Sequence, residues 1–173
     1  MTERNEREIE ILNRLSQHYF SVLPAEYRTY CSLTAEVSRR VLLQHGIRAV
    51  LMPCQVWHSR PSGTHHVVGF VGRGSSAAKW DGHVVCATPG FIIDAALHHF
   101  EREFQLPVPP VVVASRNQLS SQSIAVTTLS TGDTLLWLNP PPLRKGSLRI
   151  PQSPEAVVSD LTASLSLQSR ISP

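Results

Sequence analysis

The spacing of apolar residues changes at Gly46, and this change constrains the fold more than any other feature. Before Gly46, apolar residues recur every three or four positions, which is the period of a helix with one buried face. In residues 3–20 these are Ile9, Leu12, Leu15 and Tyr19. After Gly46, short runs of Val, Ile and Leu are separated by Gly, Pro and Ser, which is typical of strands and turns. The sequence therefore predicts an α+β fold, with N-terminal helices packed on an antiparallel β-sheet.

Residues that break helices and strands set the expected bounds of these elements. Pro24 lies just beyond the first helix, and Gly46 ends a second helix over residues 31–45. Pro53 is expected to interrupt the first strand, which spans 47–57. Further strands are predicted at 66–71, 80–87, 91–94, 111–113, 124–126 and 135–138, and a short helix at 95–104.

Three consecutive prolines, Pro140 to Pro142, divide the chain near its C-terminal end. A regular helix or a central strand cannot contain them. We therefore expect a single cysteine-enzyme-like α+β domain over 1–138. Residues 139–173 are expected to form a Pro-rich connector and a C-terminal helix that docks on the same domain. The docking face should consist of Val157, Val158, Leu161 and Leu165.

Composition and charge exclude several classes of protein. With 173 residues, of which 42% are hydrophobic, the chain is long enough for one domain with a substantial core. The net charge of +3 comes from 16 basic and 13 acidic side chains that are scattered along the sequence, so no nucleic-acid surface is expected. No apolar run is long enough to span a membrane, and the charged first residues are unlike a secretory signal. These features predict a cytoplasmic protein.

The cysteines, Cys31, Cys54 and Cys86, are too few and too widely spaced for a disulfide framework or a zinc site. The pairs His65–His66 and His98–His99 have no carboxylate or thiolate grouped with them, so we expect surface or packing roles for both. The sequence therefore predicts no metal and no cofactor, and leaves the possibility of one reactive thiol.

Cys31, His83 and Asp94 are the residues best placed for chemistry. Cys31 opens a predicted helix, where the positive end of the helix dipole favours a thiolate. His83 and Asp94 lie on the two strands of a predicted hairpin, so that the carboxylate can orient the imidazole and stabilise its cation. The order and spacing predict a catalytic triad in which Cys31 is the nucleophile, His83 the base and then the acid, and Asp94 the orienting carboxylate.

The region around residues 25–95 resembles the transglutaminase-like and papain-like cysteine enzymes. Their pattern is a Cys that starts a helix, a Gly-Ile pair that ends it, a His on one strand and an Asp on the next. The matching residues are 30–35, 46–50, 80–85 and 91–94. Arylamine acetyltransferases share this order, but their Arg-Gly-Gly before the Cys is replaced here by Arg28-Thr29-Tyr30.

The resemblance implies a papain-like or transglutaminase-like core and acyl transfer through a thioester on Cys31. We expect an amide or ester hydrolase, of the peptidase or amidase type, whose substrate is a peptide, a protein or a small amide or ester. The Gln that papain-like enzymes place shortly before the Cys is absent, since Gln17 lies farther upstream. The backbone N–H of Cys31 is therefore the expected oxyanion donor, together with a second donor that the sequence does not identify.

Two other functions stay open for the same residues. One is transfer of the acyl group to an amine, as by a transglutaminase or an N-acetyltransferase. The other is a non-catalytic binding module on the same fold. Exposure of Cys31 to a cleft favours an enzyme, whereas a Cys31 sealed in the core favours the binding module.

Each residue of the triad also has a purely structural interpretation. Cys31 can be a small buried hydrophobe, His83 an ordinary strand residue, and Asp94 the N-cap of the helix that follows it. Cys54 with His58 is a weaker catalytic candidate, because no later carboxylate is placed to assist the histidine.

The remaining chemistry-bearing residues are expected to be structural. Cys86 lies at an odd spacing from His83 on the same strand, so it should face the opposite side, in the core. Trp57 and Trp80 can line a pocket, although aromatic residues on strands more often belong to the core.

Overall fold

The first two helices form where the apolar spacing predicts them, in a computed structural model that describes residues 3–70, 81–116, 122–140 and 149–168. They are α1 (Glu3–Val22) and α2 (Cys31–Gln44), with a 3-10 turn, η1 (Ala25–Tyr27), between them. Ile11, Leu12, Leu15 and Tyr19 of α1 are completely buried. Gly46 follows α2 with a φ of +74°, a left-handed conformation that glycine adopts without strain.

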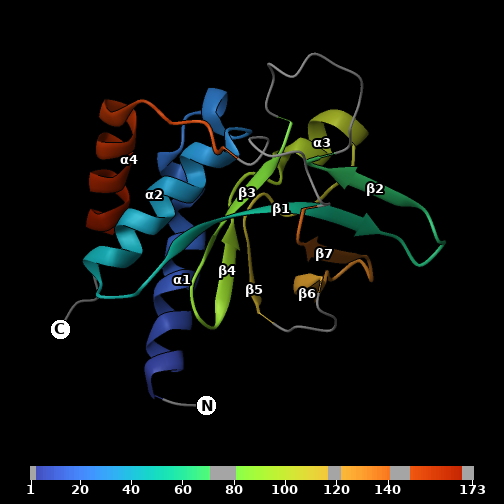
Figure 1. Ribbon diagram of the computed structural model, residues 1–173, viewed down its shortest axis with the longest axis horizontal. Coiled ribbons are helices and arrows are strands. Elements are labelled where there is room, and N and C mark those ends of the chain that lie inside the picture. The colour runs from blue at the N-terminus through green and yellow to red at the C-terminus, as the bar shows by residue number, and fades with distance from the viewer. Residues whose placement is uncertain (1–2, 71–80, 117–121, 141–148, 169–173) are drawn as a thin grey trace.

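The described strands form one antiparallel sheet that is strongly curved (Figure 1). They are β1 (Val50–Ser59), β2 (His65–Val68), β3 (His83–Ala87), β4 (Phe91–Asp94), β5 (Val112–Ser115), β6 (Ser123–Thr128) and β7 (Thr134–Leu138). Their order across the sheet is β5-β4-β3-β1-β7-β6, and β2 pairs with β1. Since β5 and β6 approach each other at the two ends of this order, the sheet is nearly closed. The predicted α+β class is confirmed.

Strand β1 runs through Pro53, so the interruption expected at this proline is wrong. Residues 50–54 of β1 pair with β3, with Pro53 opposite Val84. Strands β2 and β7 pair with β1 only from Gln55 or Val56 onward. At Pro53, β1 therefore has no paired strand on the side away from β3. A proline, which lacks an N–H, is tolerated in a strand where one side has no partner.

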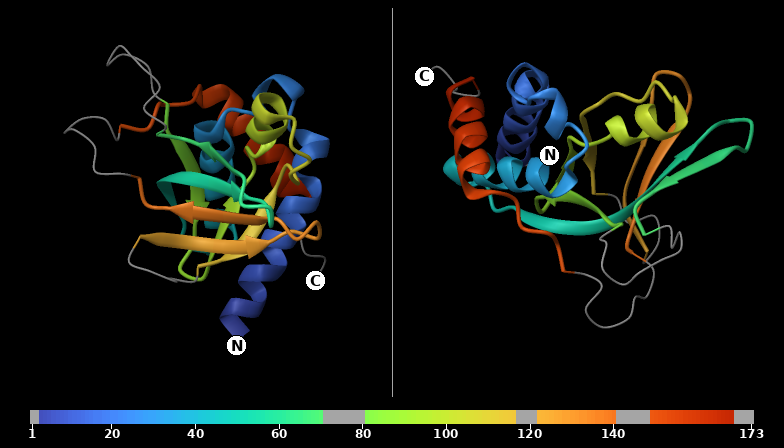
Figure 2. Two further views of the ribbon diagram at one scale, coloured as in Figure 1. Left: turned by 90° about the vertical axis from the view of Figure 1, so that its right-hand side faces the viewer. Right: turned by 90° about the horizontal axis from the view of Figure 1, so that it is seen from above.

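Two hydrophobic cores lie on the two faces of the sheet. The first joins α1, α2 and α4 (Glu155–Gln168) to the outer face, where Val84 and Cys86 of β3 contribute. The second fills the concave side and contains Val85 and Ala87 of the same strand, together with residues of α3 (His98–Phe104). Figure 2 shows the three longer helices gathered on one side of the curved sheet. Alternate residues of β3 therefore serve different cores.

Helix α4 packs against α1 and α2 through Val158, Leu161 and Leu165, which are buried, and Val157, which is partly buried. An ion pair between Arg40 of α2 and Glu155 supports this contact, with two bonds of 2.6 and 2.7 Å. The prolines at 141 and 142 lie outside the described residues. None of the helices in the described part of the chain is long and apolar enough to cross a membrane.

Candidate active site

Cys31 is the first residue of α2, as the sequence predicts. The main-chain N–H of Thr34 donates to the Tyr30 carbonyl oxygen at 3.0 Å, which is the first hydrogen bond of the helix. The Cys31 side chain is 7% exposed, whereas Cys54 and Cys86 are each 0% exposed. Its Sγ lies 3.8 Å from the carbonyl oxygen of Gly82. The thiol is therefore placed against the residue that precedes His83.

The structure brings His83 and Asp94 into direct contact. His83 begins β3 and Asp94 ends β4, and the pairing of Ala87 with Ile92 puts both residues on the concave face. Nε2 of His83 lies 2.8 Å from Oδ2 of Asp94. Both side chains are buried, at 1% and 0% exposure. The hairpin predicted from the sequence thus forms the expected histidine–carboxylate pair.

Asp94 receives two further hydrogen bonds. The indole Nε1–H of Trp137 donates to Oδ2 at 2.8 Å, and the main-chain N–H of Ala96 donates to Oδ1 at 3.1 Å. Helix α3 begins only at His98, with Leu97 as its N-cap. Asp94 is therefore not a helix N-cap, and the structural interpretation considered for it is wrong. Its carboxylate is instead held in one orientation toward His83.

The electrostatics of this pair follow from its burial and contacts. Burial opposes a charge on His83, but the Asp94 carboxylate and the neighbouring Cys31 thiol outweigh it and raise the pKa of His83 to about 10. Burial also opposes the charge of Asp94, but His83, Trp137 and the Ala96 N–H lower its pKa below the ordinary value. The pair is therefore an imidazolium and a carboxylate near neutral pH. Nδ1 of His83 has no hydrogen-bond partner among the residues that the structure describes.

Gly69 is a functional position that sequence reasoning missed. Its φ is +84°, and a Cβ built there would lie 2.8 Å from both Cβ and N of His83. A glycine is thus required where the chain passes against the imidazole-bearing residue. The available signal was a glycine inside the predicted strand 66–71, since such a glycine marks a bulge or a close approach of two backbones.

Trp137 was also missed, although two other tryptophans were considered. Trp137 is completely buried, and a buried indole N–H needs an acceptor, which Asp94 supplies. Trp57 is only partly buried and donates to its neighbour Gln55 at 2.7 Å. Trp80 lies outside the described residues. The alternation of residues on β7 indicates that Trp137 faces inward, but it does not indicate that Asp94 accepts its hydrogen bond.

The expected oxyanion donor is already engaged. The N–H of Cys31 bonds to the carbonyl oxygen of Thr29 at 3.2 Å. The same oxygen accepts a hydrogen bond from Nε2 of His99 at 2.7 Å. Burial and the nearby positive charge of His83 lower the pKa of His99, whose ring centroid is 6.2 Å from that of His83. The Cys31 N–H is therefore not free to act as the sole oxyanion donor in this conformation.

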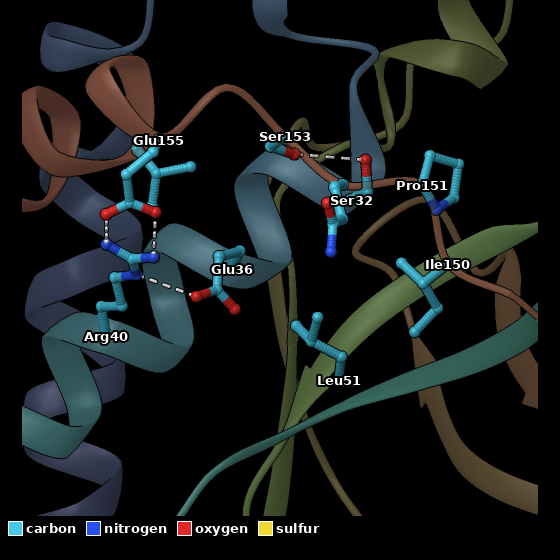
Figure 3. A pocket seen from close by; sticks show the side chains of 10 residues that line it. Ser32, Glu36, Arg40, Leu51, Ile150, Pro151, Ser153 and Glu155 are labelled. Atoms are coloured by element: carbon cyan, nitrogen blue, oxygen red, sulfur yellow. Dashed lines mark hydrogen bonds and ion pairs between the residues drawn. The ribbon is translucent and has the colours of Figure 1, made fainter.

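Two cavities are lined by residues that lie close to Cys31 in the sequence. One, of about 490 Å³, includes Ser32 in its lining, and the other, of about 270 Å³, includes Thr29. In the larger cavity, Ser32 faces Ser153 with 3.4 Å between their hydroxyl oxygens, and Arg40 bonds to both Glu36 and Glu155 (Figure 3). Neither of these two cavities has Cys31 among its described lining residues.

Cys54 and His58, the weaker catalytic candidates, are kept apart by the fold. His58 is buried and bonds to Asp133 at 3.0 Å, so the expectation that no later carboxylate reaches His58 is wrong. Cys54 nevertheless lies opposite His83, four residues along the strand from His58. Burial raises the pKa of Cys54 well above the ordinary value. Cys54 and His58 therefore do not form a catalytic pair.

Cys86 belongs to the outer core, as expected, on the face opposite to Val85. Burial raises the pKa of Cys86 to about 12, so its thiol stays protonated at neutral pH. Among the described residues, no group of three or more His, Cys, Asp or Glu side chains is arranged to hold a metal ion.

Comparisons with known proteins do not assign this chain to a class. No family model, curated protein or solved structure matches it. The geometry of Cys31, His83 and Asp94 is therefore the basis for inferring a function.

Proposed function

We propose that this protein is a cysteine-dependent acyl-transfer enzyme that hydrolyses an amide or an ester through a thioester on Cys31. The observation that carries the proposal is the buried His83–Asp94 pair, 2.8 Å between Nε2 and Oδ2, beside the thiol at the start of α2. The order of these residues is also that of the transglutaminase-like and papain-like enzymes, which supports the same assignment.

The chemistry follows from the charge on His83. An imidazolium beside a thiol favours the thiolate, and so does the N-terminal end of a helix. In the proposed reaction, the Cys31 thiolate attacks the carbonyl carbon and forms a tetrahedral intermediate. Its collapse breaks the bond to the leaving group, which takes the Nδ1 proton of His83 and departs as an amine or alcohol. The products of this first half are a thioester on Cys31 and a neutral imidazole.

The second half of the proposed reaction returns the enzyme to its starting state. Nδ1 of the neutral His83 accepts a proton from water as the water oxygen attacks the thioester carbonyl. The tetrahedral intermediate then expels the thiolate and releases a carboxylic acid. Asp94 stays ionised throughout and keeps the His83 ring in one orientation, since Trp137 and Ala96 hold its two oxygens.

The small exposure of Cys31 favours a second candidate function. At 7% exposure, the thiol is close to sealed, and the described lining of the two cavities does not include it. A binding module that has lost turnover fits this observation. In that case the His83–Asp94 pair serves only to hold β3 and β4 together.

Trapping of the thioester distinguishes the two functions. The full-length protein is mixed with a panel of p-nitrophenyl esters and peptide p-nitroanilides, quenched with acid, and mapped by mass spectrometry. We expect an acyl group on Cys31 that hydroxylamine removes, and none in Cys31→Ala. Cys86→Ala, which removes a thiol of the outer core, should retain the adduct. Acylation that is absent throughout the panel, or equal in wild type and Cys31→Ala, contradicts the enzyme.

A further inference from the structure

Four of the six residues that line the smaller cavity, of about 270 Å³, have side chains that can donate hydrogen bonds or carry positive charge. Its lining residues are Ala25, Arg28, Thr29, His98, Glu101 and Arg102. Two guanidinium groups and an imidazole thus surround a small space beside the segment that leads into Cys31. This composition differs from that of the larger cavity, where Arg40 is bound by two carboxylates.

Arg28 is held in place without an anionic partner. Its guanidinium carbon lies over the Phe20 ring, 4.7 Å from the ring centre, which is the distance of a cation–π contact. Its buried Nε has no hydrogen-bond partner among the described residues. A buried guanidinium N–H that is left unpaired costs free energy, which an added anion would offset.

His98 shares the aromatic support of Arg28. Its ring packs edge-on against Phe20, with 5.2 Å between the ring centroids. Nδ1 lies 2.8 Å from the Glu101 carboxylate, and the buried Nε2 has no partner within the described part of the chain. The Glu101 carboxylate is therefore already engaged, and it faces the imidazole.

Arg102 supplies a second guanidinium from α3. Its Nη1 lies 3.4 Å from the hydroxyl oxygen of Thr29, a long contact that leaves most of the guanidinium donors unused. Within the described residues, no carboxylate lies within ion-pair distance of Arg28 or Arg102. The cavity therefore combines two unpaired positive charges with fork-shaped donors, which is the arrangement that suits a carboxylate or a phosphate.

We propose that this cavity binds a carboxylate or phosphate group of the substrate on which Cys31 acts. The inference rests on the proposed function, because Thr29 connects the two sites. The Thr29 side chain lines the cavity and contacts Arg102, while its carbonyl accepts the N–H of Cys31. Of the lining residues, Thr29 is two positions and Arg28 three positions before the nucleophile along the chain. The cavity thus selects an acyl donor with a negative charge close to the scissile carbonyl.

The direct test measures anion binding by the full-length protein. Inorganic phosphate and acetate are titrated in turn, at constant ionic strength with chloride, and binding is followed by the His98 ring signals in NMR spectra. We expect saturable shifts that Arg28→Gln and Arg102→Gln weaken by about tenfold or more, the loss expected for a charged hydrogen bond. Arg48→Gln, which removes an exposed charge near the opposite end of α2, should bind as wild type. Arg28→Lys keeps the charge but loses the fork, and should bind more weakly than wild type.

The link to Cys31 is tested with two alkylating agents of the same size. Iodoacetate carries a carboxylate and iodoacetamide does not, and in both the thiolate displaces iodide from the same CH₂ carbon. We expect the rate ratio of iodoacetate to iodoacetamide at Cys31 to fall about fivefold or more in Arg102→Gln, an exposed position, and to stay constant in Arg48→Gln.

The outcomes separate this inference from the proposed function. Phosphate and acetate binding that is absent, or that the Arg28 and Arg102 variants leave unchanged, overturns the anion site. An unchanged rate ratio contradicts the proposal that the cavity binds part of the substrate of Cys31. A Cys31 that resists both reagents contradicts the proposed function, whereas the titration still decides whether the cavity binds anions. Tighter binding of phosphate than of acetate favours a phosphorylated substrate, and the reverse order favours a carboxylate.

Discussion

Three donors converge on the buried carboxylate of Asp94, and only one of them, His83, can change its charge. Trp137 and the Ala96 N–H keep the carboxylate ionised and oriented whether or not His83 is protonated. The imidazole therefore has one fixed nitrogen, Nε2, and one nitrogen, Nδ1, that has no hydrogen-bond partner among the described residues. This division is what a residue that gives and takes a proton requires.

Replacement of Asp94 by Asn tests this orientation. An amide can accept from Trp137 or Ala96, but it can also turn its NH₂ group toward His83 and favour the wrong tautomer. We expect Asp94→Asn to remain folded and to lose about 10³–10⁴-fold in turnover, by analogy with the loss that follows removal of an orienting carboxylate. Steady-state kinetics and circular dichroism measure the two effects. A variant with full turnover would show that Asp94 is only structural.

Gly69 gives a second prediction at the scale of one residue. Gly69→Ala must bear both a left-handed φ of +84° and a Cβ that meets His83 at 2.8 Å. We expect a loss of at least about 2 kcal/mol in unfolding free energy, since the strain alone costs about 1–2 kcal/mol. Gly63→Ala is the matched control, because Gly63 has a φ of +87° and nothing within 4 Å of the added Cβ. Equal losses in the two variants, measured by urea unfolding, would contradict the close approach.

At the scale of elements, the His83–Asp94 pair joins the first residue of β3 to the last residue of β4. The hairpin between them is short, and its register is set by Ala87 and Ile92 in the inner core. Helix α2 then brings Cys31 to the end of β3 where His83 begins. The candidate site therefore lies where three element ends meet, and no loop of the described chain supplies Cys31, His83 or Asp94.

The pair makes the stability of the protein depend on pH in a defined direction. A pKa of about 10 for folded His83, against an ordinary value of 6.5, means that folding favours the protonated ring. Its contribution is complete below pH 6.5 and is lost as the pH rises toward 10. The lowered pKa of Asp94 adds stability that is lost as the pH falls through the acidic range.

Urea unfolding of wild type and His83→Gln across this range measures the contribution. We expect the difference in unfolding free energy between the two proteins to shrink by several kcal/mol from neutral to alkaline pH, since one pKa unit corresponds to about 1.4 kcal/mol. A difference that stays constant, or grows, as the pH rises would contradict an ion pair in the folded state.

The sequence could predict the helices and the hairpin because their causes are local. The apolar period of α1, the glycine after α2 and the turn between β3 and β4 each act over a few residues. Pro53 was misjudged because its tolerance depends on which side of β1 has a partner, and this is a property of the whole sheet. The bond of Trp137 to Asp94 and that of His58 to Asp133 join distant segments, so they could not be derived from spacing along the chain.

At the scale of the whole molecule, a helical layer packs against one side of a nearly closed sheet (Figure 2). Cys31 belongs to the helical layer, whereas His83 and Asp94 face the interior of the sheet. Helix α4 lies on the far side of α1 and α2 from the sheet interior and contributes no member of the triad. Substitutions in α4 are therefore expected to change the stability of the protein but not the reactivity of Cys31.

Leu165 of α4 tests this expectation. It is 1% exposed, so Leu165→Ala should lower the unfolding free energy by about 2–4 kcal/mol, through lost burial and a cavity. Leu167→Ala, at a position that is 63% exposed, should change it by less than about 0.5 kcal/mol. Both variants should keep the selective alkylation of Cys31 while they are folded. Loss of that selectivity in folded Leu165→Ala would show that α4 shapes the site.

The central claim, that His83 activates Cys31 as a nucleophile, is tested most directly by competition among the three thiols. The folded protein is treated with limiting iodoacetamide at about pH 6, where an ordinary thiol reacts slowly, and the labelled positions are mapped by mass spectrometry. We predict that Cys31 is alkylated first and that His83→Gln abolishes its advantage. Preferential labelling of Cys54 or Cys86, or an advantage of Cys31 that survives His83→Gln, would contradict the claim.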